Sequence, residues 1–245
     1  MFGNSASCLN DRKSWSNASY EESNTINDRS SYSASHIDNN NLKSITTYDT
    51  ISSSRNEENN MSFVIMMANY KGMACAADSR STAGTDWFPT VESDNLTKVF
   101  KNDTMLVATF GPNRVNDDNI KIEEIINEIM IVSTNPFEFS ENFRKRICDN
   151  KTYNFLIGWK NNIYEYKISS KEVKYCFKGK NYACINKGEF NDAIGIEFNY
   201  TYPSDILEDK CRKAVENAIE LCKKAPYSYV GGAIKSYHLS FDEDK

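Results

Sequence analysis

Residues 63–84 read FVIMMANYKGMACAADSRSTAG, and this stretch decides the fold of the chain. It contains two apolar runs, 63–68 and 73–77, which are joined by Asn-Tyr-Lys-Gly at 69–72. Short apolar runs on either side of a turn signal predict two buried strands that pair as a hairpin. Polar residues begin at Asp78, directly after the second predicted strand.

The rest of the globular part predicts further strands and three helices. Strands are expected at 105–109, 153–158, 163–168, 173–177 and 234–239. Apolar residues at helical spacing mark 119–132, 138–148 and 204–224, and Ser204 is placed as a helix start. Together these elements predict an α+β protein with a substantial antiparallel sheet system.

The first 60 residues have a different composition, with 14 Ser and 11 Asn. Such a segment cannot bury enough apolar surface to offset the entropy lost on ordering. We therefore expect residues 1–61 to be a disordered Ser/Asn-rich leader or a mis-assigned start. The alternative is a propeptide that masks a new N-terminus until it is removed. Residues 62–245 are expected to form the globular domain.

Composition excludes several classes of function. The chain has 245 residues and a net charge of -5 without a basic stripe, which argues against a nucleic-acid partner. It has neither an apolar run of roughly 20 residues nor a secretory signal, so we expect a cytoplasmic protein without a membrane partner. The seven cysteines form no C-x-x-C pair, which favours packed thiols over disulfides or a metal site. With only two histidines, His36 and His238, the chemistry must use other groups.

A longer set of motifs resembles one known family. AADSRSTAG at 76–84, followed by TKVF at 97–100, is similar to proteasome β subunits and their bacterial ring-forming peptidase relatives. The likeness covers residues 62 to about 240. It implies the fold of N-terminal nucleophile (Ntn) hydrolases, a four-layer αββα sandwich of two antiparallel sheets flanked by helices. The later matching motifs are ATFG at 108–111, FLIGW at 155–159, YEY at 164–166 and YVGGAI at 229–234.

In that family the first residue of the mature chain is the nucleophile, usually Thr. The family's spacing from Asp78 points to Ser62. A free α-amine, with a pKa of about 7.7–8.0, can serve as the base for a hydroxyl on the same residue, so no histidine is needed. Ser62 becomes terminal either by self-cleavage after Met61, or by a translation start at Met61 and removal of that Met. The second route is favoured, because self-cleaving precursors usually carry Gly before the nucleophile.

The resemblance also implies an activating pair. Lys98 matches the lysine whose ammonium stabilises the developing alkoxide, and Asp78 matches the carboxylate that holds this lysine. Lys101 is a competing candidate. The interval from Asp78 to Lys98 is four residues longer than in close relatives, and we assign the extra residues to an extended loop at 85–94. The alternative is an ordinary ion pair without catalysis.

Gly111 resembles the family's oxyanion-hole glycine, whose backbone N–H would be worth roughly 3 kcal/mol of barrier. The alternative is a turn glycine before Pro112. The resemblance further implies a neutral, modest substrate pocket, with Thr82 pairing with the peptide backbone. The pocket residues are Ser81, Thr82, Leu96, Thr109 and Asn113.

Some positions depart from the family. Lys187 stands where relatives have the Ser of a Gly-Ser-Gly turn, and Tyr227 and Val230 stand where they have an Asp and a Ser. These groups orient the α-amine and relay its proton, so their replacement predicts slow or absent hydrolysis. Ser62 in place of Thr also lacks the methyl group that fixes the hydroxyl rotamer.

The first hypothesis is therefore a peptidase of the threonine type with Ser62 as nucleophile. It would act on peptides or unfolded proteins, assemble into a homo-oligomeric ring and be fed by an ATP-dependent unfoldase. The second is a non-catalytic ring or scaffold subunit with the same fold, and a third is hydrolysis of non-peptide amides by the same groups. The mechanism requires no cofactor or metal, and none is expected.

Overall fold

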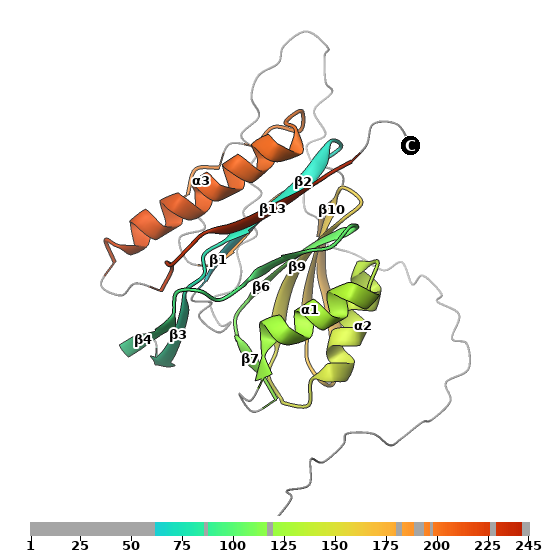
Figure 1. The fold of residues 1–245 in the computed structure, drawn as a ribbon, viewed down its shortest axis with the longest axis vertical. Helices are drawn as coiled ribbons and strands as arrows, with labels where there is room; N and C mark the ends of the chain where they lie inside the picture. The colour runs from blue at the N-terminus through green and yellow to red at the C-terminus, as the bar shows by residue number, and fades with distance from the viewer. Residues whose placement is uncertain are drawn as a thin grey trace, which may run out of the picture. The chain divides into compact units, whose positions relative to one another are not determined.

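Two large antiparallel sheets, two short two-stranded sheets and three helices make up the described part of the chain (Figure 1). The computed structural model describes residues 62–85, 88–116, 120–179, 183–188, 194–196, 198–225 and 229–241. The predicted leader, residues 1–61, lies outside the described residues. Within this part, the prediction of an α+β protein with antiparallel sheets is confirmed.

The first sheet is built around the hairpin that opens the domain. Its strand order is β12-β1-β2-β13, and every neighbouring pair is antiparallel. Both β1 and β2 are buried along their whole length, which explains why their sequences are continuous apolar runs. The strands are β1 (Phe63–Asn69), β2 (Gly72–Ala77), β12 (Ala183–Gly188) and β13 (Lys235–Ser240).

The second sheet has the order β11-β10-β9-β6-β5 and is also antiparallel throughout. Its central strands alternate between two buried faces, so they too are rich in large apolar residues. The strands are β5 (Val99–Lys101), β6 (Met105–Phe110), β9 (Tyr153–Trp159), β10 (Asn162–Ile168) and β11 (Val173–Gly179).

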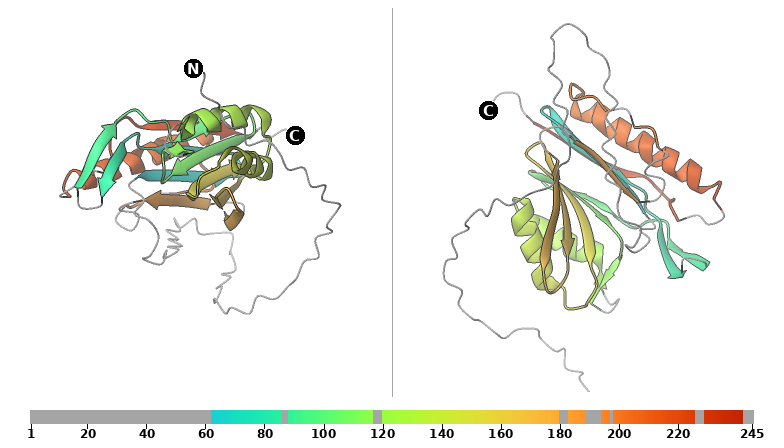
Figure 2. Two further views of the ribbon diagram at one scale, coloured as in Figure 1. Left: turned by 90° about the horizontal axis from the view of Figure 1, so that it is seen from below. Right: turned by 180° about the vertical axis from the view of Figure 1, so that it is seen from behind.

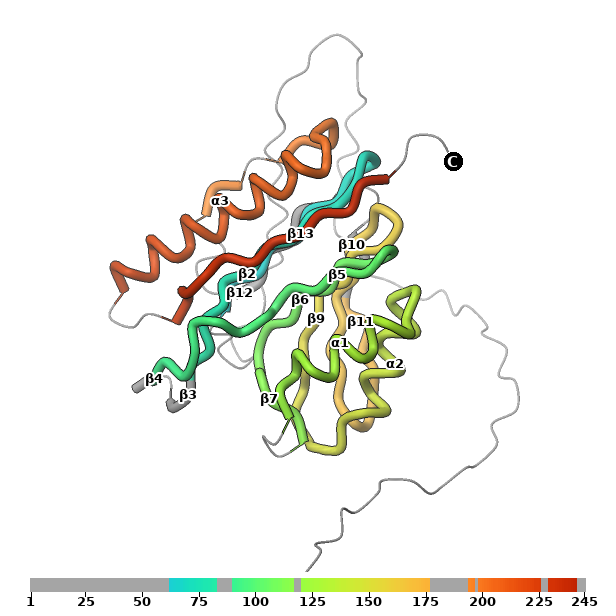
Figure 3. Tube along the Cα trace, viewed as in Figure 1, coloured from blue at the N-terminus to red at the C-terminus, as the bar shows by residue number. Residues whose placement is uncertain are grey.

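Alternate side chains of the strands divide the core into three apolar clusters. Phe63, Ile65 and Met67 of β1 pack with Leu207 and Val215 of helix α3 (Ser204–Cys222). Side chains of the opposite face of β1, such as Val64 and Met66, pack with Leu106 and Leu156 of the second sheet. The tube in Figure 3 shows β1, β2 and β13 lying between α3 and the second sheet.

The third cluster lies on the other face of the second sheet. Helices α1 (Ile122–Val132) and α2 (Pro136–Arg146) pack there, and the rings of Phe143 and Phe155 meet edge to face with centroids 4.7 Å apart. The two views of Figure 2 show α3 and the α1–α2 pair on opposite sides of the two sheets. No helix in the described ranges is long and apolar enough to cross a membrane.

The predicted elements are confirmed with small differences at their ends. Helix α2 begins at Pro136, because the side chain of Asn135 accepts a hydrogen bond from the backbone N–H of Glu138. Helix α3 begins at Ser204 as expected, but the Ser204 hydroxyl lies 2.6 Å from that of Ser240 and makes no capping bond.

The prediction of an extended loop at 85–94 is wrong. The chain forms a two-stranded hairpin there, β3 (Ser81–Thr85) and β4 (Phe88–Ser93), with Thr82 opposite Val91. The β-branched residues Thr82, Thr90 and Val91 suit strands, and the ladder satisfies backbone groups that a loop would leave to water. A second short pair, β7 (Arg114–Val115) and β8 (Ile120–Lys121), leads into α1.

Candidate functional site

Ser62, Asp78 and Lys98 lie together where the first two strands meet the start of β5. Ser62 directly precedes β1, Asp78 directly follows β2, and Lys98 directly precedes β5. Because β1 and β2 are antiparallel neighbours, the start of one lies beside the end of the other. Ser62 and Asp78 are 16 positions apart in the sequence, and Asp78 and Lys98 are 20 apart, but all three are neighbours in space.

Lys98 joins the other two side chains. Its Nζ donates hydrogen bonds to Ser62 Oγ at 3.0 Å and to Asp78 Oδ1 at 2.9 Å. All three residues are buried, with exposed fractions of 6% for Ser62, 3% for Lys98 and 1% for Asp78. The hydroxyl of Ser62 is thus held against an ammonium group that is shielded from water.

Burial lowers the pKa of the Lys98 ammonium, and the Asp78 carboxylate opposes this shift through its charge and its hydrogen bond. The nearby Arg80 charge lowers the pKa of Lys98 further. Buried ion pairs contribute little to stability, since the desolvation of both charges offsets their attraction. The Lys98–Asp78 pair therefore adds little to the stability of the fold, but it determines the electrostatic potential around Ser62.

Backbone N–H groups fix the orientation of the Asp78 carboxylate. Phe63 N–H donates to Oδ1 at 2.9 Å, while Arg80 N–H and Gly231 N–H each donate to Oδ2 at 3.2 Å. With Lys98, the carboxylate accepts four hydrogen bonds from four separate segments of the chain. The sequence indicated Asp78 as a partner of Lys98, but it gave no sign of these three backbone donors.

A small pocket opens beside the Ser62 hydroxyl. Gly111 lines it with a positive φ of 105°, a conformation that favours glycine. Six of the predicted site residues are among its walls, together with three apolar neighbours. The lining residues are Ser62, Leu96, Lys98, Thr109, Phe110, Gly111, Pro112, Asn113 and Ile122.

The remaining two predicted pocket residues lie on β3. Ser81 is not a wall of the pocket, but its hydroxyl accepts a hydrogen bond from Asn113 Nδ2 and donates one to Glu92 Oε2 at 2.9 Å. Thr82 lies half-buried next to Ser81 on β3, outside the lining residues of the pocket. Glu92 was missed, because it belongs to the segment that was expected to be a loop.

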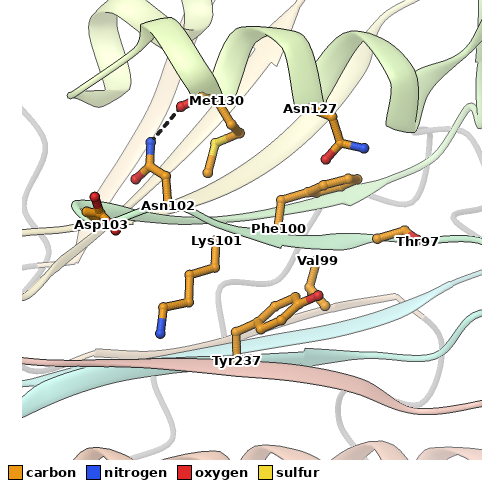
Figure 4. A pocket seen from close by; sticks show the side chains of 9 residues that line it. All are labelled: Thr97, Val99, Phe100, Lys101, Asn102, Asp103, Asn127, Met130 and Tyr237. Carbon is orange, nitrogen blue, oxygen red and sulfur yellow. Dashed lines mark hydrogen bonds between the residues drawn. The ribbon is translucent and has the colours of Figure 1, made fainter.

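Lys101, the competing lysine, points elsewhere. It lies in an open hollow of about 500 Å³ between β5, β13 and α1, together with Tyr237 and Asn127. Figure 4 shows its side chain extending from β5 toward β13 beside Tyr237. Since Ser62 and Asp78 are not among the residues that line this hollow, the geometry brings Lys98 rather than Lys101 to the serine.

Arg80 and Asp94 brace the site from outside. Arg80 Nε donates to Asp94 Oδ1 at 2.7 Å, and the backbone carbonyl of Asp94 accepts a hydrogen bond from the Ser79 hydroxyl. Gly231 lies against the Arg80 guanidinium, which a Cβ there would approach to 2.6 Å. The glycine therefore allows the 229–232 segment to come close enough to bond Asp78.

Three positions, 187, 227 and 230, were predicted to differ from the family's proton-relay residues. Val230 is buried in the apolar cluster beneath α3 and offers no side-chain donor to Ser62. Tyr227 lies outside the described residues, and of Lys187 only the backbone is described, in β12 opposite Val64. Within the described ranges, no group of three or more His, Cys, Asp or Glu side chains could hold a metal ion.

Comparisons with known proteins complete this description. No protein-family description matches the sequence. No curated protein matches it either. Among solved structures, the chain is similar to eukaryotic HslV from Trypanosoma brucei, at 14% identity and a TM-score of 0.46, over 73% of this chain and 99% of that one. It is also similar to Anbu (ancestral beta-subunit) from Yersinia bercovieri, at 14% identity and a TM-score of 0.48, over 73% of this chain and 82% of that one. A role for Ser62 therefore depends on the contacts within this chain.

Proposed function

We propose that residues 62–245 form a proteasome-like peptidase domain of the Ntn hydrolase class, with Ser62 as its N-terminal nucleophile once residues up to Met61 are removed. One observation carries the proposal: the buried Lys98 ammonium bonds both the Ser62 hydroxyl and the Asp78 carboxylate. An isolated serine is a weak nucleophile, and a cation at hydrogen-bond distance stabilises its alkoxide. The three packed clusters are consistent with a four-layer αββα arrangement.

The reaction follows from these positions. Ser62 Oγ attacks the carbonyl carbon of a peptide bond while the freed α-amine of the same residue takes the hydroxyl proton. The tetrahedral oxyanion accepts a hydrogen bond from Gly111 N–H, on the pocket wall beside the hydroxyl. Collapse breaks the C–N bond, and the leaving amine takes the proton from the α-amine. Water then hydrolyses the acyl ester and restores the Ser62 hydroxyl.

By resemblance, the substrate would be a peptide or an unfolded protein. By resemblance we propose a homo-oligomeric ring around the sites, served by an ATP-dependent unfoldase. The chemistry above uses only groups of the chain itself.

A second function, a non-catalytic ring or scaffold subunit, is favoured by one observation. The family's relay serine is replaced by Val230, which is buried among apolar side chains. Without such a relay, the proton of the α-amine would have a slower route to the leaving group.

Two measurements separate these functions. Intact-mass analysis of protein from its native cell is expected to give a chain that starts at Ser62. A peptide electrophile that reacts with a hydroxyl and an amine is then expected to label that chain, but not Ser62→Ala. Ser140→Ala, which removes a buried hydroxyl in α2, is the matched control and should label normally. Retained upstream residues without labelling would favour the scaffold, and labelling that survives Ser62→Ala would exclude Ser62 as the nucleophile.

A further inference from the structure

The residue before Lys98 is held by two charged side chains from two different elements. The backbone N–H of Thr97 donates to Glu123 Oε2 at 3.0 Å, and Lys235 Nζ donates to the Thr97 hydroxyl at 2.7 Å. Glu123 lies in the first turn of α1, and Lys235 is the first residue of β13. Figure 4 shows Thr97 on the segment that passes between these two elements. The N–H and the hydroxyl of Thr97 thus each have a charged partner.

The two residues on either side of Thr97 belong to the Ser62 pocket. Leu96 and Lys98 are walls of that pocket, whereas Thr97 lines the open hollow between β5, β13 and α1. Alternate side chains of this segment therefore face the pocket and the hollow. A rotation of the backbone at Thr97 would turn the side chain of Lys98 away from Ser62.

Main-chain bonds hold the same segment from the side of the sheets. Leu96 N–H donates to the Ser79 carbonyl at 2.9 Å, and Thr109 N–H donates to the Lys98 carbonyl at 2.9 Å. These two bonds set the path of the segment. The peptide N–H between them, that of Thr97, is satisfied by a side chain that lies 26 positions further along the chain. A substitution can therefore remove this one anchor and leave the main-chain bonds in place.

We propose that Glu123 and Lys235 are positioning residues for Lys98, acting through Thr97. They hold the backbone and the side chain of Thr97 so that the Lys98 ammonium reaches Ser62 Oγ at 3.0 Å. The inference rests on the proposed function for the chemical role of Lys98, and it assigns the placement of that lysine to α1 and β13. Placement matters for the rate, because a displacement of about 1 Å in a reacting group can cost roughly 100-fold.

The placement of Lys98 can be measured by NMR without any reaction. In the full chain, isotope-labelled at the ε-carbon of lysine, the Lys98 resonance is the one that disappears in Lys98→Met. It is expected to shift in Glu123→Ala, which removes the acceptor of the Thr97 N–H. It should return to its native position in Glu123→Gln, which keeps an acceptor oxygen. Glu124→Ala is the matched control and should leave the resonance in place, because Glu124 lies in the same first turn of α1 and its loss changes the charge equally.

Two further variants test the bond from β13. Thr97→Val keeps the shape of the side chain and removes the hydroxyl, while Lys235→Met removes the donor. Each is expected to shift the Lys98 resonance, and the double variant should shift it no further than Lys235→Met alone, because both substitutions delete the same interaction. Lys145→Met, which changes an exposed lysine of α2, should leave the resonance unmoved.

Labelling by the peptide electrophile supplies the chemical readout. Once residues up to Met61 are removed, Glu123→Ala should be labelled at Ser62 about tenfold more slowly than Glu124→Ala. Glu123→Gln should be labelled within about twofold of the native rate, since the acceptor is kept. This rescue separates placement of Lys98 from a general loss of stability.

A Lys98 resonance that stays in place in Glu123→Ala, moves equally in Glu124→Ala or is not restored by Glu123→Gln would overturn the role of Glu123. An unmoved resonance in Thr97→Val would overturn that of Lys235. Equal labelling of Glu123→Ala and Glu124→Ala would overturn the effect on reaction. Failure of the proposed function has a different signature: the native chain is then not labelled at Ser62, while the resonance still shifts in Glu123→Ala and supports the placement of Lys98 by α1.

Discussion

The backbone N–H of Phe63 donates a hydrogen bond of 2.9 Å to Asp78 Oδ1, the same oxygen that binds Lys98. One carboxylate oxygen therefore positions both the peptide that follows the candidate nucleophile and the ammonium that touches its hydroxyl. A shift of Asp78 would move Ser62 and Lys98 together. This shared contact makes Asp78 the most sensitive position for testing how the site is built.

Asp78→Asn is expected to damage both the fold and the site. The amide cannot neutralise Lys98, and its NH₂ group would face the N–H donors of Arg80 and Gly231. Loss of one partner of a buried pair costs about 3–5 kcal/mol, which urea unfolding would measure. Labelling of Ser62 by the peptide electrophile should fall at least about 100-fold.

Asp149→Asn is the matched control for this substitution. Asp149 is another buried carboxylate that accepts backbone and hydroxyl hydrogen bonds, from Asn116 at 2.7 Å and Tyr153 at 2.6 Å. It should lose stability but keep normal labelling at Ser62. If Asp78→Asn labelled as fast as Asp149→Asn, the carboxylate would have no part in activating the serine.

The two lysines near β5 should respond very differently to replacement by methionine. Lys98→Met removes the cation beside Ser62 and leaves Asp78 buried without its charge partner, so labelling should fall by about 100-fold or more. Lys101→Met changes an exposed side chain and should alter the free energy of unfolding by less than about 0.5 kcal/mol, with normal labelling. Comparable losses of labelling in both variants would contradict the assignment of Lys98.

Hydrolysis should depend on pH in a bell shape. The α-amine of Ser62 must be unprotonated to accept a proton, so kcat/KM should rise with pH through about 8. Lys98 must stay protonated to stabilise the alkoxide. Because burial lowers its pKa, the alkaline fall should come below the usual value of about 10.4.

The variant Lys98→Arg checks which group produces the alkaline limb. Arginine stays charged throughout this range, so any residual activity should lose the alkaline fall and keep the acid limb. An alkaline fall at the same pH in Lys98→Arg would assign that limb to another group.

The described cysteines differ in burial, and they should react with iodoacetamide in a fixed order. Cys148 and Cys176 are exposed, but burial raises the pKa of Cys176 and reduces its thiolate fraction. Cys148 should therefore react first and Cys176 next. Burial raises the pKa of Cys75, which should be protected until the protein unfolds. Peptide mapping by mass spectrometry measures this order, and early modification of Cys75 would contradict the packing of β2.

Most of the fold could be predicted from the sequence because the buried strands are long apolar runs. Residues 63–68 and 73–77 are apolar runs of strand length on either side of a turn, a pattern that favours a buried hairpin. The apolar residues at helical spacing in 204–222 predict a helix with one face against the core. Strand β12 was not predicted, because Ala183–Gly188 mixes apolar and polar residues without a clear alternation. Its pairing with β1 depends on tertiary contacts that a local pattern does not contain.

The candidate site could be predicted only in part, for a similar reason. Ser62, Asp78 and Lys98 stand at motif positions, so the resemblance pointed to them before their contacts were known. The backbone N–H groups of Phe63 and Gly231 have no side-chain signature, and any residue type could supply such a donor. Glu92 lies on β4, and residues 85–94 contain no alternation that would have predicted the pairing of β4 with β3.

The carboxylate of Asp78 accepts hydrogen bonds from residues 63, 80, 98 and 231, which together span almost the whole domain. During synthesis, the Gly231 donor leaves the ribosome last of these four. In a nascent chain, the hydrogen bonds around Asp78 beside Ser62 are therefore incomplete until the segment with Gly231 has folded onto the domain. In the proposed peptidase, this order of assembly would protect newly made protein from cleavage by partly folded copies.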